Sequence, residues 1–521
     1  MKNFKKFTAA IAATLMAASL SIPMATSFTA SAASITINGI STEQAHTFEV
    51  YQVLTGTLDE AKKLNDMKWG SGVTSFNGAN VTTGKELSKS EFEAISAVTD
   101  ARTLITGDAP LLVLSETKAC EDVTSANGTV TINDLDDGYY IVKDTTNLEN
   151  ADDANSAWIV QVADNATVDI KNAKPTVDKQ IADNNDGEVE TGDNNGWGET
   201  ADHAINESFQ FKLTATIPAD ADLAAYETYK LTFNDTMSAG VTFDSIESVK
   251  VGDTTLTTAQ YAETATAAAN KAGLSWTLSI EDVKAIAGAS FGTAPVTVEV
   301  IYNAHLNENA IVSKESVDSI SDINKNTVSL SYSNNPDSTG TGTTDGKTTE
   351  DTVWAFTYEV DNTKYANSKA AENILAGAEF NLKNAEGTPI TFKLVDGFYI
   401  PDASGSATLT SAEGTGQFNI KGLDAGTYTL TETKTPDDYN KCDNITVVIK
   451  ATHEENADEA SAKLSLEGSS NMVNDVINKS GSTLPSTGGI GTTLFYLGGG
   501  CMVAVAGIFL ITKKRMSKNA E

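Results

Sequence analysis

Short segments in which apolar and polar residues alternate recur along most of the chain. The clearest lie at 209–217 (FQFKLTATI), 229–233 (YKLTF), 296–302 (VTVEVIY), 327–332 (TVSLSY), 356–360 (FTYEV) and 428–432 (YTLTE). A period of two places every second side chain on one face of a sheet, which predicts strands with one buried face. Turn-forming residues separate these segments at short intervals, as in antiparallel sandwiches. We therefore expect an all-β chain of three tandem immunoglobulin-like β-sandwich domains.

Two segments have a composition more typical of helices. These are 89–98 (KSEFEAISAV) and 258–273 (TAQYAETATAAANKAG), and both are rich in alanine, glutamate or lysine. We expect them to form helices in the connections between strands.

One segment of the chain is repeated. Residues 130–146 (VTINDLDDGYYIVKDTT) align with 418–434 (FNIKGLDAGTYTLTETK), so that Tyr140 matches Tyr428 and Asp144 matches Glu432. The alignment favours a repeated β-module. No lysine and asparagine accompany Asp144 convincingly, and we expect it to be a surface residue after a hairpin.

Two polar seams divide the chain. Both are rich in Gly, Asn, Asp, Ser and Thr, which favour turns and linkers, and they lie at about 171–198 and 333–352. The predicted organisation is a first module at 34–171, a second at 172–336, a linker at 337–349 and a third module at 350–480.

The two ends of the chain carry export and membrane signals. Residues 1–33 have a lysine-containing start, an apolar stretch and a small-residue cleavage pattern, so they are predicted to be a signal peptide. Cleavage after Ala32 and after Ala33 fit equally well. Residues 490–512 are apolar and long enough to cross a bilayer core of about 30 Å as a transmembrane helix. The basic residues of the tail, 513–521, then predict a cytoplasmic end.

Composition excludes some functions. The 521 residues contain 36 Lys and Arg against 70 Asp and Glu, giving a formal net charge of −34. This acidity argues against a nucleic-acid partner, because a phosphate backbone requires a basic surface. The four histidines are scattered and form no catalytic or metal-binding motif, so we predict no enzyme activity, no cofactor and no metal site. Spacing alone leaves open whether Cys120 and Cys442 form a disulfide.

The pentamer LPSTG at 484–488 resembles the LPxTG sorting signal of Gram-positive surface proteins, including the apolar span and basic tail that follow it. The resemblance implies that a sortase recognises Leu484 and Pro485, cuts between Thr487 and Gly488, and transfers the Thr487 acyl group to an amine. Proline favours an extended backbone that a groove can hold. The membrane segment would then anchor the chain only until the sortase acts, and the mature chain would lack it.

The third module resembles the collagen-adhesin B-type (CnaB) domains of Gram-positive pilins. The matching segments are 356–364 (FTYEVDNTK), 375–382 (LAGAEFNL), 422–436 (GLDAGTYTLTETKTP) and 473–478 (VNDVIN). The resemblance implies an internal isopeptide bond in which Lys364 attacks Asn478 with help from Glu432. Such an attack requires a neutral amine, and burial in a dry site favours that form.

The second module resembles the A-type (CnaA) version of these domains. It opens with 174–181 (KPTVDKQI), continues with 231–243 (LTFNDTMSAGVTF) and closes with 324–336 (NKNTVSLSYSNNP). The resemblance gives Lys179 as nucleophile, Asp235 as assisting acid and Asn326 as acceptor. Strand parity does not separate Asn326 from Asn324, which would point to the same face.

Lys171, eight positions before Lys179, resembles the acceptor lysine of shaft-forming pilins. Asp169 and Ile170 replace the Tyr-Pro pair that precedes this lysine in the family, and Lys174 is an alternative acceptor.

Taken together, the resemblance implies a major, or backbone, pilus subunit of a Gram-positive bacterium. Its implied partners are pilin-type and housekeeping sortases, other copies of itself, accessory pilins, peptidoglycan and, for adhesion, host or surface ligands. The chain would be located in a cell-wall-anchored surface pilus. The alternative is a wall-anchored adhesin or accessory pilin that never polymerises.

Overall fold

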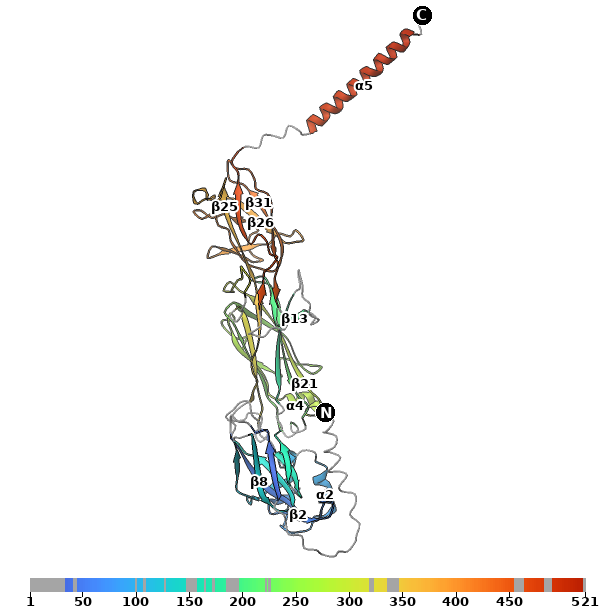
Figure 1. Cartoon of the computed structure of the whole chain (residues 1–521), viewed down its shortest axis with the longest axis vertical. Helices are drawn as coiled ribbons and strands as arrows, with labels where there is room; N and C mark the ends of the chain where they lie inside the picture. The colour runs from blue at the N-terminus through green and yellow to red at the C-terminus, as the bar shows by residue number, and fades with distance from the viewer. Residues whose placement is uncertain are drawn as a thin grey trace. The chain divides into compact units, whose positions relative to one another are not determined.

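The computed structural model is shown in Figure 1. It describes residues 33–40, 45–98, 101–105, 109–125, 128–146, 157–163, 165–170, 174–183, 196–220, 223, 226–317, 323–334, 346–453, 463–481 and 490–518. The chain divides into two compact units. Unit 1 comprises residues 1–358 and 450–467, and unit 2 comprises residues 359–449 and 468–521.

The N-terminal part of unit 1 contains three β-sheets. The first has the order β11(Ala166–Asp169), β1(Ala33–Asn38), β8(Thr129–Leu135). The second has the order β10(Ala157–Val162), β9(Gly138–Asp144), β2(His46–Leu58), β3(Leu64–Trp69), with β7(Val123–Ser125) also paired to β2. The third has the order β5(Ala79–Asn80), β4(Val73–Phe76), β6(Leu112–Leu114).

The alternation in β1 explains how these sheets pack. Ile35 and Ile37 are fully buried while Thr36 between them is partly exposed, and the two isoleucines share a core with Phe48 and Val50 of β2. The helix predicted at 89–98 is confirmed as α2(Lys89–Ser96), which begins with a capping box formed by Ser88 and Glu91. A second short helix, α3(Ala101–Ile105), follows it.

The rest of unit 1 contains two larger sheets. One has the order β13(Trp197–Gly198), β12(Thr176–Ala182), β15(Ser208–Ile217), β21(Val296–Leu306), β17(Val241–Val251), β18(Thr254–Thr255). The other has the order β14(Thr200–Asp202), β24(Asp351–Phe356), β22(Lys325–Tyr332), β16(Leu231–Met237), β20(Ser275–Ile280), β19(Ala262–Glu263), with β23(Gly346–Lys347) also paired to β22. These two sheets face each other, because buried side chains of β12 and β21 contact those of β16 and β22.

Three further elements complete unit 1. The short helix α4(Val283–Ala287) and the 3₁₀ turn η2(Gly288–Ser290) connect β20 to β21. The hairpin β33(Thr452–His453)–β34(Leu464–Ser465) also belongs to unit 1, although the sequence on both sides of residues 450–467 belongs to unit 2. Backbone hydrogen bonds between Val317 and Leu464 connect this hairpin to the rest of the unit.

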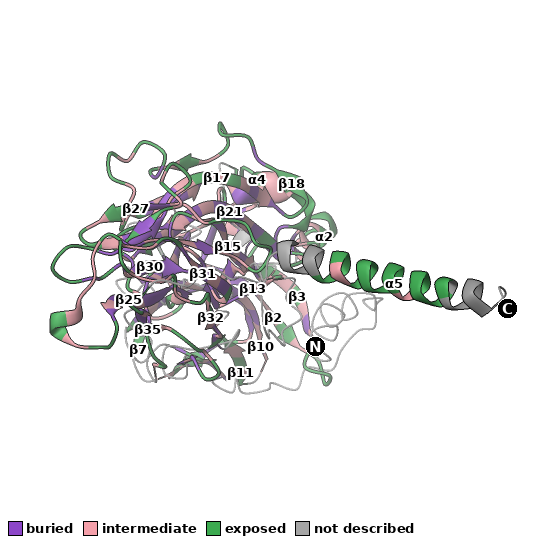
Figure 2. Ribbon diagram, turned by 90° about the horizontal axis from the view of Figure 1, so that it is seen from above, coloured by how far each residue is buried: buried purple, intermediate pink, exposed green. Residues whose placement is uncertain are grey.

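Unit 2 contains two sheets. One has the order β27(Phe392–Val395), β28(Phe398–Pro401), β30(Ile420–Leu423), β25(Tyr358–Ala366), β35(Val473–Asn478). The other has the order β29(Leu409–Thr410), β26(Glu379–Lys383), β31(Gly426–Lys434), β32(Ile445–Ile449). A 3₁₀ turn, η3(Ala371–Asn373), follows β25. The helix α5(Ile490–Lys518) lies in the C-terminal segment, and Figure 2 shows that buried residues gather on the strands while α5 is mostly exposed.

The prediction of an all-β chain is confirmed. Four of the six alternating segments lie wholly on strands, whereas 229–233 begins two residues before β16, and 356–360 spans the end of β24 and the start of β25 with Thr357 between them. The helix predicted at 258–273 is wrong, because this segment forms turns and the short strand β19. Glu263 pairs with Leu278 of β20, and Ala265 is fully buried, so tertiary packing overrides the helix propensity of its alanines.

The C-terminal helix of the predicted anchor is present as α5. Within the part of the chain that the structure describes, no helix meets the length and apolarity needed to cross a membrane. The transmembrane segment at 490–512 stays a prediction. The predicted signal peptide, except for its last residue, lies outside the described residues.

Candidate functional site

The first candidate site centres on Lys179, whose side chain is fully buried on β12. Its Nζ lies 5.3 Å from the ring centroid of Phe211 and 5.6 Å from that of Tyr302, and it donates a 3.2 Å hydrogen bond to the Tyr302 hydroxyl. Burial lowers the pKa of this amine from its usual value. A lowered pKa increases the fraction of neutral amine, which is the nucleophilic form.

Asp235 on β16 is the carboxyl that meets this amine. It accepts hydrogen bonds from Lys179 Nζ, from Trp276 Nε1 at 3.1 Å and from the Tyr302 hydroxyl at 3.1 Å. Burial raises the pKa of Asp235 above its usual value, although Lys179 acts in the opposite direction. The carboxyl can therefore hold a proton and release it close to the amine.

Asn326 on β22 completes the first site. Its Nδ2 donates a 2.6 Å hydrogen bond to the Tyr302 hydroxyl, so the lysine amine and the asparagine amide contact the same oxygen. Its Oδ1 is buried and has no hydrogen-bond partner among the described residues. An unsatisfied buried carbonyl oxygen is destabilising by about 1–3 kcal/mol and is therefore rare in native proteins.

The alternative acceptor Asn324 has a different environment. Its Oδ1 accepts from the Ile311 N–H at 2.8 Å, and its Nδ2 donates to the carbonyl oxygens of Ile311 and Ala355 at 2.9 and 3.0 Å. Its backbone φ of +33° places it outside the regular strand that begins at Lys325. The alternation of side chains along the strand therefore does not extend back to Asn324. Of the two asparagines, only Asn326 lies in the site of Lys179 and Asp235.

The second candidate site lies in unit 2 and centres on Lys364 of β25. This side chain is fully buried, its Nζ donates to the Val476 carbonyl at 3.2 Å, and it lies 3.9 Å from Glu432 Oε1. The ring centroid of Phe380 is 5.9 Å from Nζ. Burial lowers the pKa of the Lys364 amine, which again favours the nucleophilic form.

Glu432 on β31 joins the lysine to Asn478 on β35. The Asn478 Nδ2 donates to Glu432 Oε1 and Oε2 at 3.0 and 3.1 Å and to the Asn440 carbonyl at 2.9 Å. A carbonyl oxygen can only accept, so Asn440 fixes which end of the amide is nitrogen. The Asn478 Oδ1 is buried without a hydrogen-bond partner among the described residues, as in the first site.

The two sites differ in how the strands bring the partners together. In unit 2, β25 and β35 are neighbouring parallel strands, with Lys364 opposite Val476, and Glu432 reaches them from the other sheet. In unit 1, Lys179 and Asn326 lie on facing sheets rather than on neighbouring strands of one sheet. A bond in unit 1 would therefore cross the core between the sheets.

The repeat predicted from sequence extends to side-chain contacts. The hydroxyl of Tyr140 donates to the Asp136 carbonyl at 2.8 Å, and that of Tyr428 donates to the Asp424 carbonyl at 2.9 Å. The surface position predicted for Asp144 is wrong. Asp144 is fully buried and lies 2.7 Å from Nδ1 of His46, which occupies the neighbouring strand β2. A histidine pairs with the acid here, whereas lysines meet the acids in the other two modules.

The remaining predictions concern the acceptor lysine, the sorting signal and two cysteines. Lys171 and the sorting-signal residues Leu484, Pro485, Thr487 and Gly488 lie outside the described residues. The alternative acceptor Lys174 is partly buried just before β12. Cys120 and Cys442 are both free thiols.

Comparisons with known families match three segments of the chain. Residues 205–336 match the Gram-positive pilin backbone subunit 2, Cna-B-like domain. Residues 359–462 match the prealbumin-like fold domain, and residues 477–518 match the LPXTG cell wall anchor motif. The first match describes the second module as Cna-B-like, which differs from the A-type expected from the sequence. No curated protein matches the chain.

Several solved pilin structures are similar to this chain at low sequence identity. The full-length major pilin SpaD of Corynebacterium diphtheriae is 17% identical, with a TM-score of 0.44, and the match covers 86% of this chain and 98% of SpaD. The T6 backbone pilin of serotype M6 Streptococcus pyogenes is 16% identical, with a TM-score of 0.47, covering 87% and 99% respectively. The RrgB pilus protein of Streptococcus pneumoniae is 17% identical, with a TM-score of 0.43, covering 88% and 99%.

The matched family models define the class. They describe domains of Gram-positive pilin backbone subunits joined to a cell wall anchor motif, which are structural proteins and not enzymes. The three matched segments together indicate a structural subunit of a surface pilus anchored to the cell wall.

Proposed function

We propose that this pilus subunit is polymerised covalently by a sortase and that each of two sandwiches is locked by an internal Lys–Asn isopeptide bond. One observation carries the proposal. Two fully buried lysines each lie beside a buried carboxyl that also reaches an asparagine, directly in unit 2 and through Tyr302 in unit 1. In both cases the asparagine Oδ1 is buried without a hydrogen-bond partner among the described residues.

In unit 2 the neutral Nζ of Lys364 attacks Cγ of Asn478. The new Nζ–Cγ bond forms as the Cγ–Nδ2 bond breaks, and Nδ2 leaves as ammonia. Glu432 lies 3.9 Å from Nζ and 3.0 Å from Nδ2, so it can take the proton from the amine and pass it to the leaving nitrogen. The fold supplies the proximity that a separate enzyme would otherwise provide.

In unit 1 the proton path includes Tyr302. Lys179 Nζ donates to Asp235 and to the Tyr302 hydroxyl, and that hydroxyl accepts from Asn326 Nδ2 while donating to Asp235. The proton released by Lys179 can therefore reach Nδ2 through the tyrosine. We assign Lys179 as nucleophile, Asp235 as acid and base, and Asn326 as acceptor.

Polymerisation would use the sorting signal and a lysine at the seam between the first two modules. A pilin-type sortase recognising Leu484 and Pro485 would cut between Thr487 and Gly488 and join the Thr487 carbonyl to Lys171 of the next subunit. A housekeeping sortase would transfer the last subunit to peptidoglycan. The alternative is an anchored adhesin or accessory pilin that never forms this bond.

The test of polymerisation is an immunoblot of wall extracts boiled in detergent. Wild type should give a high-mass ladder, Lys171→Ala should give only monomer, and Lys174→Ala should keep the ladder as the matched control. A ladder that survives Lys171→Ala but not Lys174→Ala would move the acceptor to Lys174. A single wall-bound band in every strain would contradict polymerisation and support the adhesin alternative.

A further inference from the structure

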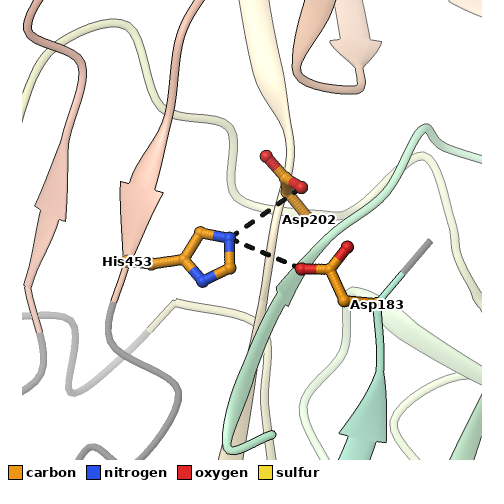
Figure 3. A group of neighbouring side chains, drawn as sticks. All are labelled: Asp183, Asp202 and His453. Atoms are coloured by element: carbon orange, nitrogen blue, oxygen red, sulfur yellow. Dashed lines mark ion pairs between the residues drawn. The ribbon is translucent and has the colours of Figure 1, made fainter. Parts of the chain in front are cut away.

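A group of three titratable side chains lies in unit 1, outside both lysine sites. Asp183 follows β12, Asp202 ends β14 and His453 ends β33. The His453 Nε2 lies 3.7 Å from Asp183 Oδ2 and 3.9 Å from Asp202 Oδ1, and Figure 3 shows both contacts converging on this one ring nitrogen. The three ligand atoms all lie within 4.8 Å of one another.

Backbone pairing holds each of these residues in place. β14 pairs in parallel with β24, and the Asp183 N–H donates to the Gly196 carbonyl at 2.7 Å. His453 is carried by the hairpin of residues 450–467, whose second strand exchanges backbone hydrogen bonds with Val317 at 2.8 and 3.0 Å. The Leu466 N–H also donates to Ser316 Oγ at 2.8 Å.

The far sides of two of the three groups are held by hydrogen bonds. The His453 Nδ1 lies 2.8 Å from the Thr200 hydroxyl, and the Tyr358 hydroxyl donates to Asp202 Oδ2 at 2.9 Å. Metal-binding histidines usually donate their second ring N–H to an oxygen, which fixes the ring and directs the other nitrogen to the metal. When Nδ1 donates to Thr200, the lone pair of Nε2 faces the two carboxylates.

The three side chains of this group are almost completely excluded from solvent. The exposed fractions of the side chains are 3% for His453, 7% for Asp202 and 9% for Asp183. Carboxyl groups in so poorly solvated a site are stabilised by a cation placed close to their oxygens. A divalent cation at the point where the three atoms converge would neutralise them.

The donor atoms indicate which cation. Zinc binds imidazole nitrogen together with carboxylate oxygen, whereas calcium prefers a shell of six to eight oxygens. We propose that Asp183, Asp202 and His453 bind one zinc ion and that this ion fastens the hairpin of residues 450–467 within unit 1. The site is separate from both isopeptide sites and does not depend on the proposed polymerisation.

The test is calorimetric titration of the purified full-length chain with zinc chloride, and separately with calcium chloride. We expect one zinc per chain and weaker binding of calcium. Thr200→Val removes a positioning group and should weaken zinc binding about 10- to 100-fold. His453→Ala and Asp183→Asn each remove a ligand and should weaken it further, and Asp183→Asn serves if the alanine variant fails to fold.

His305→Ala is the matched control. Its Nδ1 lies 2.9 and 3.0 Å from the two carboxylate oxygens of Asp244 in the same unit, and this partly exposed pair has no third ligand among the described residues. Its zinc affinity should equal that of wild type. Wild-type chain that binds no zinc would overturn the proposal. Equal affinity in wild type, His453→Ala and Asp183→Asn would also overturn it, because the zinc would then be bound elsewhere.

Discussion

Replacing Glu432 by glutamine removes the proposed proton carrier of unit 2 while keeping nearly the same shape. In wild type the Cys442 N–H donates to Glu432 Oε2 at 2.8 Å, and the Asn478 amide donates to the same carboxyl. In the variant both donors still face a polar group of similar size. The amide cannot accept the proton that Lys364 must release. We therefore expect Lys364 and Asn478 to stay unlinked in Glu432→Gln.

The size of the effect on stability follows from the loop that the bond closes. A bond between Lys364 and Asn478 closes about 115 residues, and restricting the unfolded chain by such a loop stabilises the folded state by about 5 kcal/mol. For a unit of roughly 100 residues this corresponds to a loss of about 20 °C in the unfolding temperature. Leaving Lys364 beside a neutral amide adds to the loss, because a buried charge then lacks its partner.

Intact mass and calorimetry measure the two consequences. Glu432→Gln should regain about 17 Da, the mass of one ammonia, relative to the deficit of wild type, and its unit 2 transition should occur at lower temperature. Lys364→Met loses the bond by removing the nucleophile and keeps Glu432, so a loss of stability common to both variants reports the effect of the cross-link. The control is Glu379→Gln, which removes a partly exposed pair with Lys434 worth at most about 1 kcal/mol and should keep the bond. A full deficit in Glu432→Gln would refute the role of this carboxyl.

Three further predictions follow from the same geometry. Asp235→Asn should remove the cross-link of unit 1 alone, which tryptic peptide mapping would show as a free Lys179 peptide beside an intact Lys364–Asn478 pair. In Asn478→Ala, burial lowers the pKa of the unlinked Lys364, so the unfolded chain binds more protons between that lowered pKa and 10.5. Its stability in urea should therefore rise with pH across this window, and a flat profile would contradict the assignment. Burial raises the pKa of Cys442 to about 11 and that of Cys120 above its usual value, so both thiols should alkylate slowly at pH 7 in the folded chain and fully in the unfolded, unreduced chain.

The strands were predictable because alternation reports directly which residues share a sheet face. The buried positions of β15 and β21 follow the period of two along their whole length. The lysine, acid and asparagine positions came from the family resemblance, and the structure brings Lys179, Asp235 and Asn326 together.

The contacts between sheets were not predictable in the same way. Tyr302 lies on the buried face of an alternating strand, so its burial could be inferred, but not that its hydroxyl meets Lys179, Asp235 and Asn326. Alternation gives the face of a residue and not the sheet that packs against it. For the same reason no pattern in the sequence indicated that His46 would meet Asp144.

His453 illustrates a second limit of prediction from sequence. Its segment lies in the middle of the sequence of unit 2, and only the folded chain shows that residues 450–467 belong to unit 1. The helix predicted at 258–273 failed for a related reason, since Ala265 is buried by packing that composition does not report.

The intact mass of the purified wild-type chain tests the central claim most directly. Two Lys–Asn bonds release two molecules of ammonia, so the account predicts a mass about 34 Da below that calculated for the same residues. Tandem mass spectrometry should then join the Lys179 peptide to that of Asn326 and the Lys364 peptide to that of Asn478. A mass equal to the calculated value would contradict both cross-links.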